Sequence, residues 1–195
     1  TGHAGLQVCE PDRVSSPVTL SRPLFYSRAM TLPGNSPFDL TGRVALVTGG
    51  NSGIGLGMAE GLAAHGADVA IWGTNAEKNE RAIDALSQYD VELLSFVCDV
   101  SDEAAVIQSM AETVEELGRV DAVFVNAGVG GRAPSFVEMT SEEWRRVMSV
   151  NLDGVFHGCR VFMPLLLAQG SGHIMNTASL GGLLPSSSAY SASKA

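Results

Sequence analysis

Tyr190 and Lys194 have the spacing of a proton-transfer pair near the end of this 195-residue chain. The two residues are four positions apart, so on a helix they lie on one face, one turn from each other. A free phenol releases its proton only near about pH 10, but a neighbouring ammonium group favours the phenolate form. Such a phenol can protonate a carbonyl oxygen during reduction, or take the proton of an alcohol during oxidation. A solvated helix face is the simpler explanation for a Tyr/Lys pair alone, so this chemistry needs support from other residues.

Ser179 is a further candidate for the same chemistry. It follows an apolar segment at 173–177 that we predict to be a strand. At the end of that strand its hydroxyl could hydrogen-bond the substrate oxygen and hold the carbonyl for attack by a hydride. Thr177 could compete for this role. The three groups together would suit carbonyl reduction or alcohol oxidation.

A glycine-rich turn, TGGNSGIG, is the candidate nucleotide site. It lies between a predicted strand at 43–48 and a predicted amphipathic helix at 54–65. Gly49 permits a sharp exit from the strand, Gly53 lets the backbone approach a pyrophosphate, and Gly55 lets the helix pack close to the strand. The free N–H groups and partial positive charge of the helix N-terminus favour phosphate there. The residues expected to contact a dinucleotide in this turn are Thr48, Gly49, Asn51, Ser52, Gly53, Ile54 and Gly55.

The end of the strand predicted at 68–72 should meet the adenosine ribose. An NAD site usually carries Asp or Glu there to bind the 2′-hydroxyl. This chain reads WGTN at 72–75, and its first acid is Glu77. Without an acid nothing repels a 2′-phosphate, and Thr74 and Asn75 could donate hydrogen bonds to it. Because no acid is present, we expect NADP to be preferred. Because no arginine is present at this point to bind the 2′-phosphate, we keep NAD as the alternative.

The elements that must position these residues alternate from Phe38 onward. Strands are predicted at 43–48, 68–72, 92–98, 122–125 and 173–177. Helices are predicted at 54–65, 76–87, 101–117 and 140–168. Thr140 and Glu143 have capping-box spacing at the start of the last helix. Such apolar strands are typical of parallel sheets buried on both faces, joined by right-handed crossovers. The pattern therefore predicts the α/β class, a Rossmann-type doubly wound parallel sheet with helices on both faces.

Five motifs in this order resemble the short-chain dehydrogenase/reductase family, over a stretch from about Leu40 to the last residue. They are TGxxxGxG in the glycine turn, Asn126-Ala127-Gly128 after the fourth predicted strand, Asn151, Ser179, and the YSASK segment at 190–194. The resemblance implies an NAD(P)-dependent oxidoreductase. Such an enzyme transfers a hydride between the nicotinamide and a small ketone, sugar acid or 3-oxoacyl thioester, or the matching secondary alcohol. Its catalytic residues would be Asn151, Ser179, Tyr190 and Lys194.

The resemblance also implies finer roles at the catalytic end. Lys194 would bind the nicotinamide ribose as well, so it and Tyr190 count among the cofactor contacts. Asn151 would anchor a water that links Lys194 to solvent. The local match of the segment NTAS at 176–179 favours Ser179 over Thr177 as the catalytic hydroxyl.

Further cofactor contacts are implied elsewhere in the chain. Asp99 and Val100 would contact the adenine, although Asp99 could simply cap the next helix. Asn126 would stabilise the central strands and line the cofactor cleft. Its neighbours Ala127 and Gly128 complete the family's NNAG motif, in which this chain has Val125 at the first position.

Two departures from the family bear on activity. The segment from Ser179 to Tyr190 is shorter than usual, so we expect a substrate-side loop of different shape. Family members also continue with the rest of the catalytic helix, another strand, a substrate lid and a last strand. We therefore expect these 195 residues alone to be an inactive, poorly soluble fragment of an enzyme that is a homodimer or homotetramer at full length. The remaining alternative, a non-enzymatic nucleotide-binding protein of the same fold, has no need of the Tyr190–Lys194 pair.

Composition bounds the domains and partners. Residues 1–37 hold five of the eight prolines and no periodicity, which predicts a disordered or non-native tail, with Met30 as an alternative start. One Rossmann-fold dinucleotide-binding and catalytic domain is expected at 38–195. A net charge of −9 with scattered basic residues argues against a nucleic-acid partner. No apolar stretch approaches the roughly 18 residues of a membrane span, which argues against a membrane partner.

The three cysteines, Cys9, Cys98 and Cys159, show no disulfide or metal-ligand spacing. They are typical of reduced thiols in a cytoplasmic protein without a metal site. We expect Cys98, Trp72, Trp144 and the methionines to lie in the core.

Overall fold

The computed structural model describes residues 37–183 and 188–195, so nearly all of the predicted tail, with Met30 and Cys9, lies outside the described residues. Its centre is a parallel sheet of five strands in the order β3-β2-β1-β4-β5. The strands are β1 (Val44–Thr48), β2 (Asp68–Gly73), β3 (Leu93–Val97), β4 (Ala122–Val125) and β5 (His173–Asn176). The strand order reverses between β1 and β4, and the carboxyl ends of these two parallel strands lie side by side. In a doubly wound sheet ligands bind outside that point.

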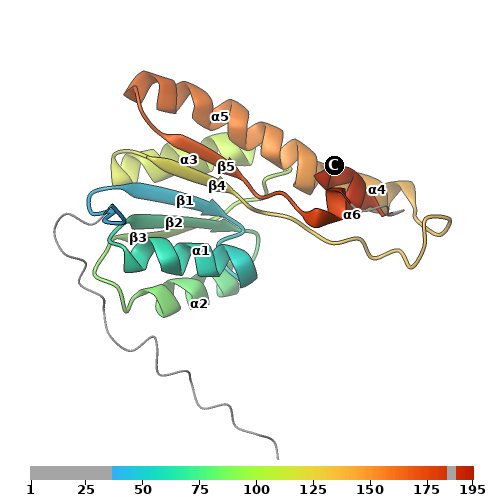
Figure 1. Cartoon of the computed structure of the whole chain (residues 1–195), viewed down its shortest axis with the longest axis horizontal. Helices are drawn as coiled ribbons and strands as arrows, with labels where there is room; N and C mark the ends of the chain where they lie inside the picture. The colour runs from blue at the N-terminus through green and yellow to red at the C-terminus, as the bar shows by residue number, and fades with distance from the viewer. Residues whose placement is uncertain (1–36, 184–187) are drawn as a thin grey trace, which may run out of the picture.

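Helices cover both faces of the sheet (Figure 1). The helices α1 (Gly53–Ala64) and α2 (Ala76–Leu86) lie on one face, and α3 (Glu103–Leu117) and α5 (Gly154–Gln169) lie on the other. Three short elements gather beyond the carboxyl ends of β4 and β5: α4 (Ser141–Met148), the 3-10 turn η2 (Leu180–Gly182) and α6 (Ala189–Lys194). This architecture confirms the predicted Rossmann-type doubly wound sheet. Within the described residues, no helix is long and apolar enough to cross a membrane.

The long helix predicted at 140–168 is continuous from Ser141 to Gln169, but a π-helical turn, η1 (Ser149–Asp153), divides it into α4 and α5. Asn151 lies in this turn and is 1% exposed. Its side chain binds both backbone groups of Val129, a residue of the loop after β4. Those buried hydrogen bonds stabilise the extra residue in the turn, as side chains that enter a helix ladder often do. An apolar periodicity does not reveal one inserted residue.

The core forms two clusters, one on each face of the sheet, because successive strand residues point to opposite faces. Val47 and Ile71 pack against α1 and α2, whereas Leu46 and Trp72 pack toward α3 and α5. The Trp72 ring lies 5.6 Å from that of Phe162, measured between centroids. Its indole N–H is satisfied, because it donates to the Thr113 hydroxyl. Trp72 and Cys98 are buried, as predicted.

Several other residues that were predicted to lie in the core are exposed at the surface, so those predictions are wrong. Trp144 is 38% exposed on α4, and Met163 and Met175 are also exposed. Strand β5 is largely exposed too, although all strands were expected to be buried on both faces. Among the described residues β5 pairs with β4 alone and forms an edge of the sheet. An edge strand has fewer neighbours to bury its side chains, which residue type alone does not show.

Asp121 joins the starts of β1 and β4 through hydrogen bonds. Because these bonds need an ionised carboxylate, we expect part of the free energy of unfolding to be lost in acid. The Asp121 carboxylate accepts the Val44 N–H at 3.0 Å and binds the guanidinium groups of Arg119 and Arg43. Burial alone would raise the pKa of Asp121, but these hydrogen bonds outweigh burial and lower it. A lowered pKa means that the stabilisation is complete above the unfolded-state value of about 3.9 and is lost as the pH falls through the folded-state value.

We therefore expect Asp121→Asn to lower the free energy of unfolding by about 2–3 kcal/mol at neutral pH, since a buried N–H and two cations lose a charged partner. The deficit should shrink as the pH falls below about 3.9 and through the lowered folded-state pKa of Asp121, because the wild type then loses the same stabilisation. Urea unfolding at several pH values measures this, with the exposed Asp90→Asn as the matched control. A deficit that stays constant down to about pH 2 would contradict the assignment.

Candidate active site

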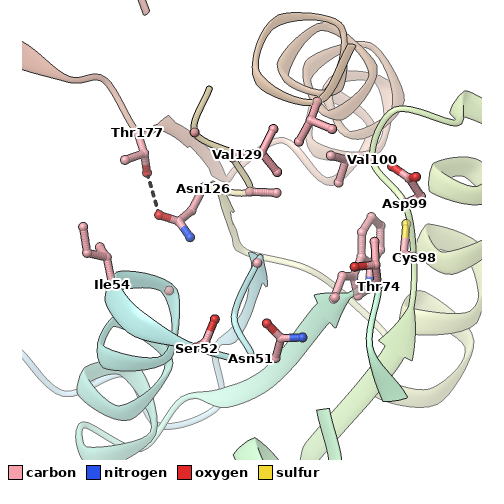
Figure 2. A pocket seen from close by; sticks show the side chains of 18 of the residues that line it. Asn51, Ser52, Ile54, Thr74, Cys98, Asp99, Val100, Asn126, Val129 and Thr177 are labelled. Carbon is pink, nitrogen blue, oxygen red and sulfur yellow. Dashed lines mark hydrogen bonds between the residues drawn. The ribbon is translucent and has the colours of Figure 1, made fainter. Parts of the chain in front are cut away.

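A cleft of about 530 Å³ opens at the carboxyl ends of the strands. In Figure 2 Ser52 and Asn51 lie on one side of it, Cys98 and Asp99 across from them, and Asn126 and Thr177 near the start of α1. Thirteen of the residues predicted to form the site line this cleft. They are Gly49, Asn51, Ser52, Ile54, Gly55, Thr74, Asp99, Val100, Asn126, Ala127, Gly128, Tyr190 and Lys194.

The glycine turn is shaped by close backbone approaches. Gly49 has a φ of +66°, a left-handed conformation that favours glycine, and a Cβ there would lie 3.0 Å from the Cα of Ala127. A Cβ at Gly55 would overlap the carbonyl oxygen of Gly49. The Ser52 side chain makes no cap hydrogen bond to α1. The turn is thus a backbone cradle next to a helix N-terminus, an arrangement that suits a phosphate.

Thr48 supports the site from behind the cleft. It is only 2% exposed, and its hydroxyl accepts the N–H groups of Asn126 and Ala127, both at 3.0 Å. The Asn126 amide in turn donates to the Thr48 carbonyl at 3.1 Å. Thr177 donates to the Asn126 side-chain oxygen at 3.2 Å, the bond drawn in Figure 2. These bonds join the ends of β1, β4 and β5, so Thr48 positions the cleft wall and does not line it.

Asn79 organises the far end of the cleft, and the sequence analysis missed it. This buried residue of α2 donates to the carbonyls of Gly73 and Phe96 and accepts the Asn51 amide at 2.7 Å. A Cβ at Gly73 would lie 2.6 Å from Cγ of Asn51 and 2.7 Å from Oδ1 of Asn79. The amide pair therefore fills the space that a side chain at position 73 would need. The sequence did carry a signal for this residue. Asn79 has helical spacing with Ala82 and Leu86, which places a polar side chain on the buried face of α2.

The predicted ribose and adenine contacts divide between lining and structural positions. Thr74 is exposed and lines the cleft, whereas Asn75 caps α2 by accepting the N–H of Lys78 at 2.9 Å and does not line the cleft. Gly53 is likewise not among the lining residues. Asp99 lines the cleft and accepts the N–H and hydroxyl of Ser101, while Asp102 caps α3. Asp102, and not Asp99, is therefore the residue that caps α3, so the capping alternative for Asp99 is wrong.

The four predicted catalytic residues lie around α6. Lys194 donates through Nζ to the carbonyl of Thr177 at 2.9 Å. The Ser179 hydroxyl accepts the Gly181 N–H at 3.1 Å. A Cβ at Gly181 would lie 3.3 Å from that hydroxyl and 3.1 Å from the Tyr190 ring, so Gly181 allows the two side chains to approach each other.

Asn151 reaches the same place through Ser193. Its Nδ2 group donates to the Ser193 hydroxyl at 2.9 Å and to the Val129 carbonyl at 3.0 Å, and its Oδ1 accepts the Val129 N–H at 2.8 Å. The Ser193 hydroxyl donates to the backbone carbonyl of Tyr190 at 2.7 Å. Both donors of Asn151 are therefore used to hold α6 and the β4 loop. The expected water anchored by Asn151 stays a prediction.

Tyr190 also lines a second cavity, of about 510 Å³. The other residues that line it are mostly apolar: Gly130, Gly131, Ala133, Pro134, Ser135, Phe136, Met139, Glu143, Ser188 and Ala189. Among the residues that the structure describes, only Tyr190 and Gly130 line both cavities. Tyr190 thus stands where the cleft lined by the glycine turn meets a mostly apolar pocket.

A family model described as short chain dehydrogenase matches residues 43–195. The chain belongs to the short chain dehydrogenase family. It is 39% identical over 169 residues to levodione reductase of Leifsonia aquatica, covering 85% of this chain and 63% of that protein. It is 42% identical over 159 residues to the NADP-dependent (R)-specific alcohol dehydrogenase of Lentilactobacillus kefiri, covering 80% and 62%.

Solved structures agree with this assignment. The crystal structure of NAD+-bound xylitol dehydrogenase matches with a TM-score of 0.76 and 35% identity, over 80% of this chain and 60% of that one. Both of these dehydrogenases are oxidoreductases; the alcohol dehydrogenase is NADP-dependent, and the xylitol dehydrogenase structure contains NAD+. This chain spans slightly less than two thirds of the curated relatives that it matches.

One thiol of this short chain dehydrogenase borders the cofactor cleft. Cys98 follows β3 and is 3% exposed. Burial raises the pKa of its thiol, an effect that the hydrogen bond with Ser109 partly offsets. The thiol is therefore protonated at neutral pH and acts as a small apolar part of the wall.

Proposed function

We propose that this short chain dehydrogenase transfers a hydride between the nicotinamide of NADP or NAD and the carbonyl or secondary alcohol of a small molecule. The observation that carries the proposal is the place of Tyr190 on the wall of both cavities. The residues around the first cavity fit a dinucleotide, because Gly49 and Gly55 leave a backbone cradle that a Cβ would fill. The bound nicotinamide would supply or accept the hydride.

The chain's own residues would orient the substrate and move its proton. Tyr190 would donate its phenolic proton to the carbonyl oxygen in reduction, or accept the proton of the alcohol in oxidation. Ser179, on the same side of Gly181, would hydrogen-bond that oxygen. Lys194, one turn along α6, would stabilise the phenolate by its positive charge and bind the nicotinamide ribose. The apolar pocket would hold the rest of the substrate and exclude water from the reacting atoms.

A direct assay tests this proposal. In the full-length protein, we expect NADPH or NADH to quench the fluorescence of Trp72, which lines the first cavity. We also expect at least one ketone in a panel of cyclic, aliphatic and 3-oxoacyl compounds to oxidise the bound coenzyme. Binding without turnover of any ketone or alcohol would favour the alternative, a non-enzymatic nucleotide-binding protein. No binding of either coenzyme would overturn both. Levodione is a sensible first substrate, because a reductase of that compound is among the relatives.

We propose that NADP is preferred over NAD. Thr74 is exposed at the cleft, and its hydroxyl can donate to a 2′-phosphate. The segment 72–75 at the end of β2 holds no carboxylate, so the only acid lining the described part of the cleft is Asp99 after β3. The Asn51–Asn79 pair leaves no room for a side chain at Gly73. A preference for NADH in the wild type would defeat the idea.

Thr74→Asp should reverse this preference. A carboxylate there repels the 2′-phosphate and accepts hydrogen bonds from the ribose hydroxyls of NADH, so the ratio of kcat/KM for NADPH over NADH should fall by at least about tenfold. The two coenzymes are compared with one ketone at saturation. Thr74→Asn is the isosteric neutral control, and an equal fall in both variants would show that charge is not the cause.

We also propose that the protein assembles as a homodimer or homotetramer. Exposed apolar residues lie along one face of η1 and α5 at helical spacing: Leu152, Phe156, Met163 and Leu167. A contiguous apolar face of this kind marks an interaction surface. Sedimentation velocity would measure the assembly, and a monomer at all concentrations would refute it. A cytoplasmic location stays a prediction.

A further inference from the structure

We propose that Glu143 and Arg146 are positioning residues that hold the wall between the two cavities and so set the affinity for the carbonyl substrate. The wall is the segment Val129–Arg132, which follows β4 and belongs to no helix or strand. Gly130 in this segment lines both cavities. The kinetic part of this proposal rests on the proposed hydride transfer, and its structural part does not.

Side chains from α4 and η1 hold four backbone groups of this wall. Arg146 donates through Nη2 to the Gly130 carbonyl at 2.7 Å, and Glu143 accepts the Arg132 N–H. Asn151 binds the N–H and the carbonyl of Val129. Two glycines in sequence give the wall a flexible backbone, so these bonds must supply the order that a helix or strand supplies elsewhere.

Glu143 and Arg146 also bind each other. Nε of Arg146 donates to Oε2 of Glu143 at 2.9 Å, and Nη2 donates to Oε1 at 3.0 Å, a two-point pairing that fixes the guanidinium plane. One nitrogen, Nη2, therefore serves both Glu143 and the Gly130 carbonyl. The hydrogen bonds from Arg146, and then that from the Arg132 N–H, lower the pKa of Glu143 to about 2. The carboxylate stays ionised through the working pH range, so the pairing does not switch with pH.

The π-helical turn explains how one helix reaches the whole wall. Glu143 and Arg146 are three residues apart and share a face of α4. Asn151 is five residues beyond Arg146, which on a regular α-helix would turn its side chain well away from that face. Asn151 lies within η1, where a turn contains more residues than in an α-helix, so its side chain is rotated back toward that face. All three side chains then reach the same loop.

The capping box predicted for Glu143 is only half present. The Thr140 hydroxyl accepts the Glu143 N–H at 3.2 Å, as predicted. The Glu143 carboxylate instead binds Arg132 and Arg146, because a half-buried guanidinium group and a loop N–H compete for it. The sequence motif is therefore used to hold the wall.

The test compares Arg146→Met with Arg145→Met. The two arginines are adjacent on α4, but Arg145 is exposed and is not part of the wall contacts. We expect Arg146→Met to raise the KM for the ketone at least about tenfold, because the substrate cavity loses a wall. The Kd for NADPH should change less than about twofold, because the glycine turn and Thr74, which would hold the phosphates and the adenosine ribose, are not part of this wall. Arg146→Lys keeps the positive charge and one donor nitrogen, so its KM should lie between those of Arg145→Met and Arg146→Met. A KM that is unchanged in Arg146→Met overturns the proposal.

A second measurement is independent of catalysis. Amide hydrogen exchange at Arg132 should speed up at least about tenfold in Arg146→Met, because Glu143 loses the partner that orients it, and should be unchanged in Arg145→Met. Unchanged exchange overturns the positioning role whatever the kinetics show. If the wild type reduces no ketone, the proposed function fails, while Arg132 exchange still decides whether the two residues hold the wall.

Discussion

Replacing Tyr190 by phenylalanine in the full-length protein is expected to lower kcat by at least about 100-fold, because the ring remains but can no longer transfer a proton. Tyr190 stands on the wall shared by both cavities, and the Ser193 hydroxyl holds its backbone carbonyl on α6. The variant keeps those contacts, so its Kd for NADPH should change less than about twofold. Steady-state kinetics and quenching of Trp72 fluorescence separate the two effects.

Tyr89→Phe is the matched control, since it removes the same phenolic oxygen far from the cleft, where Tyr89 packs against the α1 and α2 side of the core. It should leave kcat unchanged. If Tyr190→Phe kept more than about a tenth of the wild-type kcat, a proton-transfer role would be untenable. If Tyr190→Phe also lost NADPH binding, the loss of activity would be explained by a disturbed coenzyme cleft and not by the loss of proton transfer.

Gly55→Ala should have the largest effect on the fold and on the cofactor cleft. The new Cβ would overlap the Gly49 carbonyl oxygen and lie 2.6 Å from Nδ2 of Asn126. The start of α1 must then move away from β1, and Asn126 loses its bond to Thr48. We expect the free energy of unfolding to fall by about 3 kcal/mol, and the Kd for NADPH to rise at least about tenfold, because the phosphate cradle is displaced.

Two glycines of the same helix provide opposite controls. A Cβ at Gly57 or at Gly61 meets nothing within 4 Å. Alanine at either position should therefore raise the free energy of unfolding by about 0.5–1 kcal/mol, because it restricts the unfolded chain and favours helix. Urea unfolding of the three variants measures these differences. Equal stability in Gly55→Ala and Gly57→Ala would show that the close approach is not required.

Much of the fold could be predicted from local patterns. The five strands and the first three helices lie within a few residues of their predicted positions, because burial imposes a period on each element that its own residues display. The glycine turn could be located for the same reason, since a positive φ at Gly49 and the close packing of Gly55 are demands on single positions. The parallel order follows from the alternation of strands and helices.

The rest depended on which distant segments meet. Asn151 inserts a π-helical turn because Val129, 22 positions away, offers its backbone groups, and Glu143 leaves its capping role for Arg132, 11 positions away. Trp144 is exposed because α4 presents it outward, although tryptophan is a common core residue. Which hydrogen-bond partner such a residue finds depends on which segments lie next to it in the folded chain. The residue type gives only the donors and acceptors that it has.

Order along the chain, the doubly wound sheet and the family-typical motifs were thus determined by the sequence itself, through periodicity and the conformations that single residues permit. The tertiary structure decided that Tyr190 borders two cavities, that Asn51 and Asn79 fill the space at Gly73, and which side chains hold the wall at Gly130. The physical reason is the same in each case. A cavity or a shared hydrogen bond exists only where separate elements approach, and that approach is a property of the packed chain.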